Sequence, residues 1–415
     1  AGESPDYNRY VTYMKAQLKE LTENYGPVLG WWFDGGWQKS WTQERGKDLF
    51  AYMRKLQPDV LTDQRIGCAY RDSVYTPTWF PSDSHRVGDY AVLEVDMPRF
   101  NRDIPWEYTI PANNRSYSWT PGAYGEVNKW IDNLVKSACG DGNFILGISA
   151  PSTGRFEPAL KDKLRDMGGW LKQYGESIFD TRGGPYKRND LYGSTCKGNR
   201  IYLHVFKTDT NDIVLPALER KVLKSYLLNG GDVKVRQTDT GIVVRIGRND
   251  FQTPTTIVVL ELDGSAEAIK PLGEVPVTRN AIVRSSDGDQ HTAKLASDGD
   301  ISTSWKAGKD VQQPWLEYDL GKEKTISRAI LFEGEEEGQY ANIHHIRIEA
   351  KQNGAWKTVS DVTSWGGGKA VFDEWTITVS PPEIRLKPVR TRYVRLQLLR
   401  CTGNPVIHEF ELYER

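Results

Sequence analysis

The sequence of 415 residues has few cysteines, no excess of charge of either sign and no long apolar run. Its four cysteines lie far apart without a Cys-x-x-Cys pair, which argues against a zinc site and a disulfide framework. The net charge is −1, from 54 basic and 55 acidic residues, so nothing in the charge favours binding to nucleic acid or an anionic membrane. No apolar segment reaches the length of a membrane-spanning helix.

The length and the aromatic content are high by contrast. A chain of this length is expected to form two to four domains. Its 14 tryptophans and 20 tyrosines suit a sugar-binding protein, because a flat ring covers the C–H face of a sugar. The alternative is that many of these rings fill the cores of β-sandwiches.

The most informative segment is residues 28–37, a short apolar run that ends on one carboxylate, Asp34, followed by two glycines and a tryptophan. Upstream, residues 10–25 have apolar side chains at helical spacing, and the Gly26-Pro27 pair ends this predicted helix. Helix, turn, apolar strand and terminal acid form a unit typical of barrel enzymes. Asp34 is therefore either a catalytic acid or a residue that caps a neighbouring helix.

The region up to about residue 182 alternates predicted helices and strands, which favours a parallel sheet or a barrel. Helices are predicted at residues 10–25, 46–56, 124–138 and 158–174, strands at 28–33 and 143–148 and near 62–65, and a loop-rich stretch at 68–120.

From residue 183 onward the pattern changes to short alternating runs separated by turns, which predicts antiparallel β-structure. Examples are residues 200–206 and 241–246, and later 345–350 and 392–396. We predict three domains: a catalytic region at 1–183, an antiparallel β-sandwich at 184–275 and a second β-domain at 276–415.

Two glutamates in the loop-rich stretch are possible partners of Asp34. A retaining glycosidase needs two carboxyl groups about 5–5.5 Å apart, which a barrel supplies from distant loops. Glu94 follows residues 87–93, and Glu107 lies in the segment Ile104-Pro105-Trp106-Glu107. Spacing alone does not choose between them, and each is alternatively a loop carboxylate in a salt bridge.

Six segments in the first 185 or so residues resemble, in the same order, segments of the retaining α-L-fucosidases of glycoside hydrolase family 29. They are residues 10–37, 56–67, 88–94, 104–107, 141–154 and 169–182. The resemblance implies a (β/α)8-like barrel, with only its C-terminal portion in this chain.

The resemblance also implies catalytic roles. Asp34 matches the nucleophile, which attacks the anomeric carbon, and Glu94 matches the acid/base, which protonates the leaving oxygen and then activates water. Glu107 is then a supporting residue, and it stays the alternative acid.

Substrate-binding residues follow from the same resemblance. Arg65 matches a sugar-contacting arginine, and Tyr117 matches an aromatic residue of the sugar pocket. Trp31, Trp32 and Trp37 are possible walls of the site, but we expect at least one of Trp31 and Trp32 to belong to the core, because neighbours on a strand face opposite sides. We expect Trp32 to contact substrate.

The sequence departs from the family in three places. The family's Thr-Pro-Glu is Val92-Leu93-Glu94 here, and Gly147 replaces an asparagine. His85 is the only histidine of the catalytic region and matches none of the family's sugar-binding histidines. Since family members carry roughly half a barrel before this point, we expect the sequence to be the C-terminal portion of a longer enzyme.

The third region resembles the F5/8 type C, or discoidin-like, domains, which include carbohydrate-binding module family 32. The matching segments are residues 293–305, 315–321, 392–396 and 407–413. The resemblance implies a β-sandwich of the jelly-roll type and a structural calcium ion, for which clustered oxygens are needed. The matching positions are Asp298, Asp300, Thr303 and Glu409, with Glu411 as an alternate. The alternative is a loop held by hydrogen bonds without metal.

The leading hypothesis is a retaining exo-α-L-fucosidase that acts on fucosylated oligosaccharides or glycoconjugates and needs no cofactor for catalysis. We expect it to be secreted, periplasmic or on the cell surface, with no nucleic acid partner and no membrane span. Two alternatives remain: an inactive glycan-binding protein, and a related glycosidase for a different sugar. The pair Asp34 and Glu94 favours the enzyme.

Overall fold

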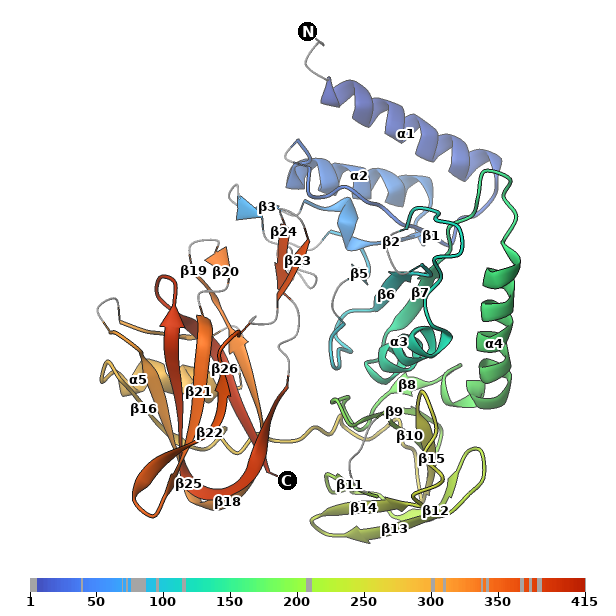
Figure 1. The fold of residues 1–415 in the computed structure, drawn as a ribbon. Coiled ribbons are helices and arrows are strands. Elements are labelled where there is room, and N and C mark those ends of the chain that lie inside the picture. The colour runs from blue at the N-terminus through green and yellow to red at the C-terminus, as the bar shows by residue number, and fades with distance from the viewer. Residues whose placement is uncertain are drawn as a thin grey trace. The chain divides into compact units, whose positions relative to one another are not determined.

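The structure, a computed structural model, divides into two compact units, Ala1–Leu272 and Gly273–Arg415 (Figure 1). No helix among the described residues is long and apolar enough to cross a membrane. The described residues are 6–38, 40–68, 70–71, 74–75, 87–94, 97–113, 117–206, 211–299, 303–308, 311–336, 339–340, 343–365, 369–372, 375–378 and 383–414.

The first part of the N-terminal unit alternates helices and strands. They are α1 (Tyr7–Asn24), β1 (Gly30–Trp31), α2 (Gln43–Leu56), β2 (Leu61–Thr62), the 3-10 turn η1 (Gln64–Ile66), β3 (Tyr70–Arg71), β4 (Val74–Tyr75), β5 (Ala91–Leu93), β6 (Trp106–Pro111), α3 (Val127–Cys139), β7 (Asn143–Gly147) and α4 (Pro158–Tyr174). The four helices agree with the sequence-based predictions.

Local capping and apolar spacing explain where the first helices form. The Asp6 carboxylate accepts hydrogen bonds from the backbone N–H groups of Asn8 (3.0 Å) and Arg9 (3.2 Å), so α1 begins earlier than its apolar pattern indicates. The buried faces of α1 and α2 meet through Leu18, Leu49 and other apolar residues.

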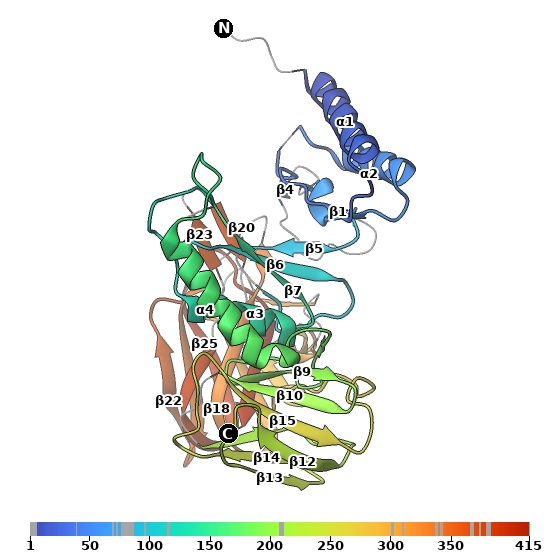
Figure 2. The same cartoon turned by 90° about the vertical axis from the view of Figure 1, so that its right-hand side faces the viewer.

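Parallel strands form the sheet of this region. β1 pairs with β2 in parallel. β5, β6 and β7 pair in that order, also in parallel (Figure 2). An isolated parallel bridge between Asp63 and Tyr90 joins the two groups. The carboxyl ends of these strands therefore share one edge. Helices α3 and α4 pack on one face of β6 and β7 through an apolar cluster that includes Trp130, Phe144 and Leu160.

Two of these strands lie inside the stretch of residues 68–120 that the sequence indicates as loop. β5 has only three residues, too few to show a periodic pattern. β6 places Trp106 and Tyr108 in a buried cluster on one face, while Glu107 and Thr109 alternate with them on the other. A glutamate in the strand interrupts the apolar run by which a buried parallel strand is usually identified.

The second part of the N-terminal unit is antiparallel. One sheet contains β8 (Arg182–Gly183), β9 (Tyr192–Lys197), β10 (Arg200–Val205), β15 (Thr256–Leu262) and β12 (Val222–Leu227); the other contains β11 (Asp212–Leu215), β14 (Gly241–Ile246) and β13 (Val233–Thr238). Buried residues of both sheets, such as Leu203 and Val244, form one core.

The C-terminal unit is built on a large antiparallel sheet whose core contains Trp305 and Phe410. Its elements are β16 (Ile282–Ser285), α5 (Gln290–Ala293), the 3-10 turn η3 (Lys294–Ser297), β17 (Trp305–Lys306), β18 (Trp315–Glu333), β21 (Ile343–Gln352), β22 (Ala355–Val362), β25 (Ile384–Cys401) and β26 (Val406–Glu414), with the small pairs β19 (Glu335–Glu336) and β20 (Gln339–Tyr340), and β23 (Lys369–Phe372) and β24 (Trp375–Thr378).

Candidate active site

Three predicted site residues lie at the carboxyl edge of the parallel sheet. Asp34 follows β1, Arg65 lies in η1 after β2, and Glu94 directly follows β5. The backbone conformation requires the first glycine after Asp34, and close packing requires the second. Gly35 has a φ of +113°, and a Cβ on Gly36 would lie 2.6 Å from the carbonyl oxygen of Gly67.

Arg65 links the two carboxylates. Its Nη1 donates to Asp34 Oδ1 at 2.7 Å and to Glu94 Oε1 at 3.3 Å. The Arg65 side chain is 8% exposed, whereas those of Asp34 and Glu94 are 48% and 31% exposed. Burial disfavours the charge of Arg65, but Glu94 and Asp34 more than compensate, and its pKa is raised. A buried cation thus holds two acids that reach solvent.

The shared nitrogen also limits the separation of the acids. Since each oxygen lies close to Arg65 Nη1, the two oxygens lie within about 6 Å of each other, near the spacing of about 5–5.5 Å found in retaining glycosidases. Inverting enzymes keep their carboxyl groups about 6.5–9.5 Å apart, to leave room for a water molecule.

Trp32 connects this pair to Glu107. The Arg65 guanidinium lies 4.8 Å from the centre of the Trp32 ring, and Trp32 Nε1 donates to Glu107 Oε1 at 3.0 Å. Burial raises the pKa of Glu107, although the hydrogen bond from Trp32 and the charge of Arg65 lower it. Trp31 packs against the helical cluster instead, so the two tryptophans do face opposite sides.

Asp63 is a further acidic residue of this region that the sequence did not single out. It is fully buried at the end of β2, and its carboxylate oxygens have no well-formed hydrogen bond with the described residues. Burial raises its pKa to about 7, with Glu107 adding to the effect, while the nearby backbone of Phe33 and the charge of Arg65 lower it. The only indication of a role for Asp63 in the sequence is its position two residues before Arg65.

Tyr117 also reaches the site. Its hydroxyl donates to Thr109 Oγ1 at 3.4 Å, and the charges of Glu94, Arg65 and Asp34 all act on the phenol. Its side chain is half-exposed. The structure therefore brings together Asp34, Arg65 and Glu94, with Trp32, Glu107 and Tyr117 around them. His85 lies outside the described residues.

Two family models match this chain. Residues 1–176 match the alpha-L-fucosidase family, and residues 281–412 match the F5/8 type C domain. The similarity to the alpha-L-fucosidase family thus covers residues 1–176.

Curated proteins that are similar in sequence to this chain are also alpha-L-fucosidases. An alpha-L-fucosidase of Branchiostoma floridae is 25% identical over 209 residues, which are 48% of this chain and 43% of the relative. The tissue alpha-L-fucosidase of Mus musculus is 24% identical over 212 residues, with the same shares. The chain spans less than half the length of these relatives.

Solved structures are similar as well. Alpha-L-fucosidase isoenzyme 1 of Paenibacillus thiaminolyticus is 26% identical, with a TM-score of 0.52, over 63% of this chain and 64% of that chain. The alpha-L-fucosidase of Vibrio sp. strain EJY3 has a TM-score of 0.59 over 97% of this chain and 71% of that chain. Its identity is 17%, so this likeness concerns the fold alone.

The F5/8 type C domain contains the acidic cluster that the sequence predicts as a calcium site. Asp298 Oδ2 accepts a hydrogen bond from Thr303 Oγ1 at 2.8 Å, and Glu409 Oε1 accepts one from the backbone N–H of Gly299. Glu409 is buried, and burial raises its pKa to about 7, with the carboxylates of Glu411 and Asp298 adding to the effect.

The other predicted ligands are Asp300 and the alternate, Glu411. Asp300 lies outside the described residues. Glu411 Oε2 accepts a hydrogen bond from Tyr413 at 2.7 Å. Within the described residues, no group of three or more His, Cys, Asp or Glu is arranged to hold a metal.

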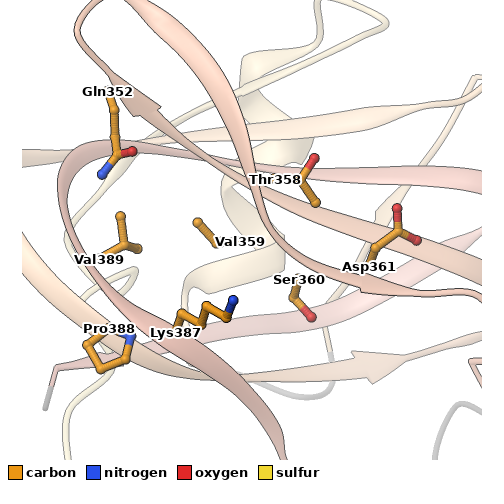
Figure 3. A pocket seen from close by; sticks show the side chains of 8 residues that line it. All are labelled: Gln352, Thr358, Val359, Ser360, Asp361, Lys387, Pro388 and Val389. Atoms are coloured by element: carbon orange, nitrogen blue, oxygen red, sulfur yellow. The ribbon is translucent and has the colours of Figure 1, made fainter.

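The F5/8 type C domain also has a shallow groove of about 370 Å³ between β22 and the first part of β25 (Figure 3). Its lining combines hydroxyl, amide and charged groups with apolar side chains: Gln352, Thr358, Val359, Ser360, Asp361, Lys387, Pro388 and Val389. Asp361 is held in place by Arg347 and His345. No motif in the sequence indicates this groove.

Proposed function

We propose that this chain carries the catalytic carboxylates of a retaining exo-α-L-fucosidase. The observation that carries the proposal is the pair of hydrogen bonds from Arg65 Nη1 to Asp34 and to Glu94. These bonds bring together, at the carboxyl edge of a parallel sheet, two acids whose bonded oxygens lie within about 6 Å of each other, which is compatible with the spacing of about 5–5.5 Å in retaining glycosidases. The alpha-L-fucosidase relatives support fucose as the sugar.

In the proposed mechanism, Asp34 attacks the anomeric carbon and forms a glycosyl–enzyme bond while Glu94 gives its proton to the leaving oxygen. Glu94 then takes a proton from water, which attacks the same carbon and releases Asp34. Arg65 orients both acids, and Trp32 supports its guanidinium from one face. The substrate is a glycan or glycoconjugate with a terminal α-L-fucose.

We infer that the parallel strands belong to a (β/α)8-like barrel. Residues that point away from the packed helices, such as Leu61 and Ile145, are 45% and 37% exposed. In a closed barrel, residues at these positions fill the interior. This inference and the predicted secretion rest on the family resemblance.

The proposal is tested with an aryl α-L-fucoside and two isosteric variants, Asp34→Asn and Glu94→Gln. We expect Asp34→Asn to lower kcat/KM by more than about 10³-fold, because no covalent intermediate forms without the nucleophile. Equal rates in the wild type and in Asp34→Asn, or no hydrolysis by either, contradict the enzyme. An aryl galactoside assayed in parallel tests the alternative of a different sugar.

We also propose a structural calcium ion held by Asp298, Thr303 and Glu409. Calcium prefers carboxylate and other oxygen ligands, and Glu409 Oε2 is a buried oxygen without a hydrogen-bonding partner among the described residues. Because the pKa of Glu409 is about 7, calcium and a proton compete for it. We expect calcium to raise Tm over a chelator control, more strongly at pH 8 than at pH 6, and not in Glu409→Gln. An equal Tm with calcium and with chelator contradicts this proposal.

A glycan-binding protein remains the second candidate, favoured by the groove of the F5/8 type C domain, whose lining offers the polar side chains of Gln352, Thr358 and Lys387 (Figure 3). In such a protein the Asp34→Asn variant binds fucosylated glycans as well as the wild type does, and neither hydrolyses them.

A further inference from the structure

Gly147, where the sequence departs from the family, is the last residue of β7 at the edge that carries the candidate site. A Cβ at this position would lie 2.7 Å from Cε1 and 2.9 Å from Cδ1 of Tyr117, closer than nonbonded carbons approach. Its backbone does not call for glycine, since its φ is not positive. The absence of a side chain at position 147 therefore leaves room for the Tyr117 ring.

Hydrogen bonds on several sides hold the Tyr117 segment against β6 and β7. The Tyr117 hydroxyl donates to Thr109 Oγ1 on β6, and Ser149 Oγ, just after β7, donates to the Tyr117 carbonyl oxygen. Next to it, Asn113 Nδ2 donates to the carbonyl oxygen of Ser118 at 2.6 Å. These hydrogen bonds fix the position of the Tyr117 ring, and Gly147 packs against it.

The seated ring lies within electrostatic reach of both candidate catalytic acids and of Arg65. Burial on one side raises the pKa of its phenol, yet 45% of the residue surface stays exposed. An aromatic ring with one packed side and one open side, next to a carboxylate pair, is suited to cover the C–H face of a pyranose.

We propose that position 147 determines sugar binding in this site, because its lack of a side chain seats Tyr117 as an aromatic wall of the sugar subsite. The location of this sugar subsite rests on the proposed function, to which the inference adds Gly147 and Tyr117 as a pair that determines specificity. Its ligand is the pyranose held between Asp34 and Glu94, with an apolar face toward Tyr117. A side chain at 147 displaces the ring and weakens sugar binding, while the two acids stay in place.

The test compares Gly147→Ala with Gly168→Ala as a matched control, since a Cβ on Gly168 in α4 meets nothing within 4 Å. We expect Gly147→Ala and Tyr117→Ala each to raise KM about tenfold with kcat nearly unchanged, because the wall binds ground state and transition state alike. Tyr117→Phe keeps the ring and retains more affinity than Tyr117→Ala. The double variant is no worse than Tyr117→Ala, because both changes remove one wall.

Additive effects in the double variant, or an unchanged KM in Gly147→Ala, overturn the inference while leaving the fucosidase proposal intact. A fall in kcat instead of a rise in KM also overturns it, because it shows displacement of the acids. A second readout does not need turnover: ¹⁹F NMR of protein labelled with 3-fluorotyrosine, with the Tyr117 signal identified by Tyr117→Phe.

Gly147→Ala is expected to shift this signal, and Gly168→Ala is not. If the wild type cleaves no fucoside, the proposed function fails, and the inference is then decided by adding fucose to the labelled wild type. A shift of the Tyr117 signal supports the inference, and an unchanged signal overturns it.

Discussion

Glu94 and Glu107 reach Arg65 in different ways, which separates their roles. Glu94 accepts a hydrogen bond from Arg65, whereas Glu107 accepts one from Trp32, on whose ring Arg65 lies. We expect Glu94→Ala to slow hydrolysis about 10²–10⁴-fold for poor leaving groups and much less for nitrophenolate, which needs little protonation. Glu107→Gln is expected to lower the rate less and equally for both. Kinetics with a series of aryl fucosides measures this, and a leaving-group dependence in Glu107→Gln instead assigns the acid to Glu107.

Asp63 gives the second prediction at this scale. Its pKa of about 7 in the folded protein lies above the ordinary value of 3.8, so the folded state holds the proton more tightly than the unfolded state does. The titration of Asp63 alone therefore lowers stability as the pH rises from about 4 to 7, by roughly 1.4 kcal/mol for each pH unit. Asp63→Asn, which does not titrate, is expected to gain Tm relative to the wild type over this range. A difference in Tm that is constant with pH contradicts the prediction.

The residues of the site were predictable to different degrees. Asp34 ends an apolar run, and Glu94 and Arg65 stand in family-like segments, so their positions were readable in the sequence. The link between them was not, because it depends on one guanidinium that reaches two strand ends. Nor was the role of Gly147, since only the position of the Tyr117 ring explains it.

At the scale of elements, the helices were predictable because an apolar stripe and a cap are local features. β6 was not predictable, because the face opposite its buried cluster carries Glu107 and Thr109. Glu107 accepts a hydrogen bond from Trp32, and Thr109 accepts one from Tyr117. A strand that supplies functional side chains departs from the apolar pattern by which such strands are found.

β10 carries a prediction of its own. His204 is fully buried, and burial lowers its pKa from 6.5 to about 3. His204 takes up a proton near pH 6.5 in the unfolded chain and only near pH 3 in the folded one, so its own contribution to the stability of the N-terminal unit is lost as the pH falls through this window. Replacing His204 by glutamine, which keeps polar atoms but does not titrate, is expected to reduce this loss. Urea unfolding at pH 7 and pH 4.5 measures it, and an equal loss in both proteins contradicts the assignment.

For the whole molecule, the division after Leu272 separates two units with their own cores. We therefore expect two transitions in calorimetry. In the C-terminal unit, Glu274 near its start and Glu383 just before β25 both pair with Arg328, whose side chain is 10% exposed and lies over the Tyr413 ring. Arg328→Met leaves these acids without their cation, at a cost of about 3–5 kcal/mol, and should lower the C-terminal transition by several degrees.

The His204→Gln variant provides the matched control, because it lies in the other unit and acts on the other transition alone. If Arg328→Met lowers both transitions together, the two units unfold cooperatively, and the separation of their cores does not make them independent. If only one transition moves, that transition belongs to the C-terminal unit. Calcium bound at Glu409 is then expected to shift the same transition.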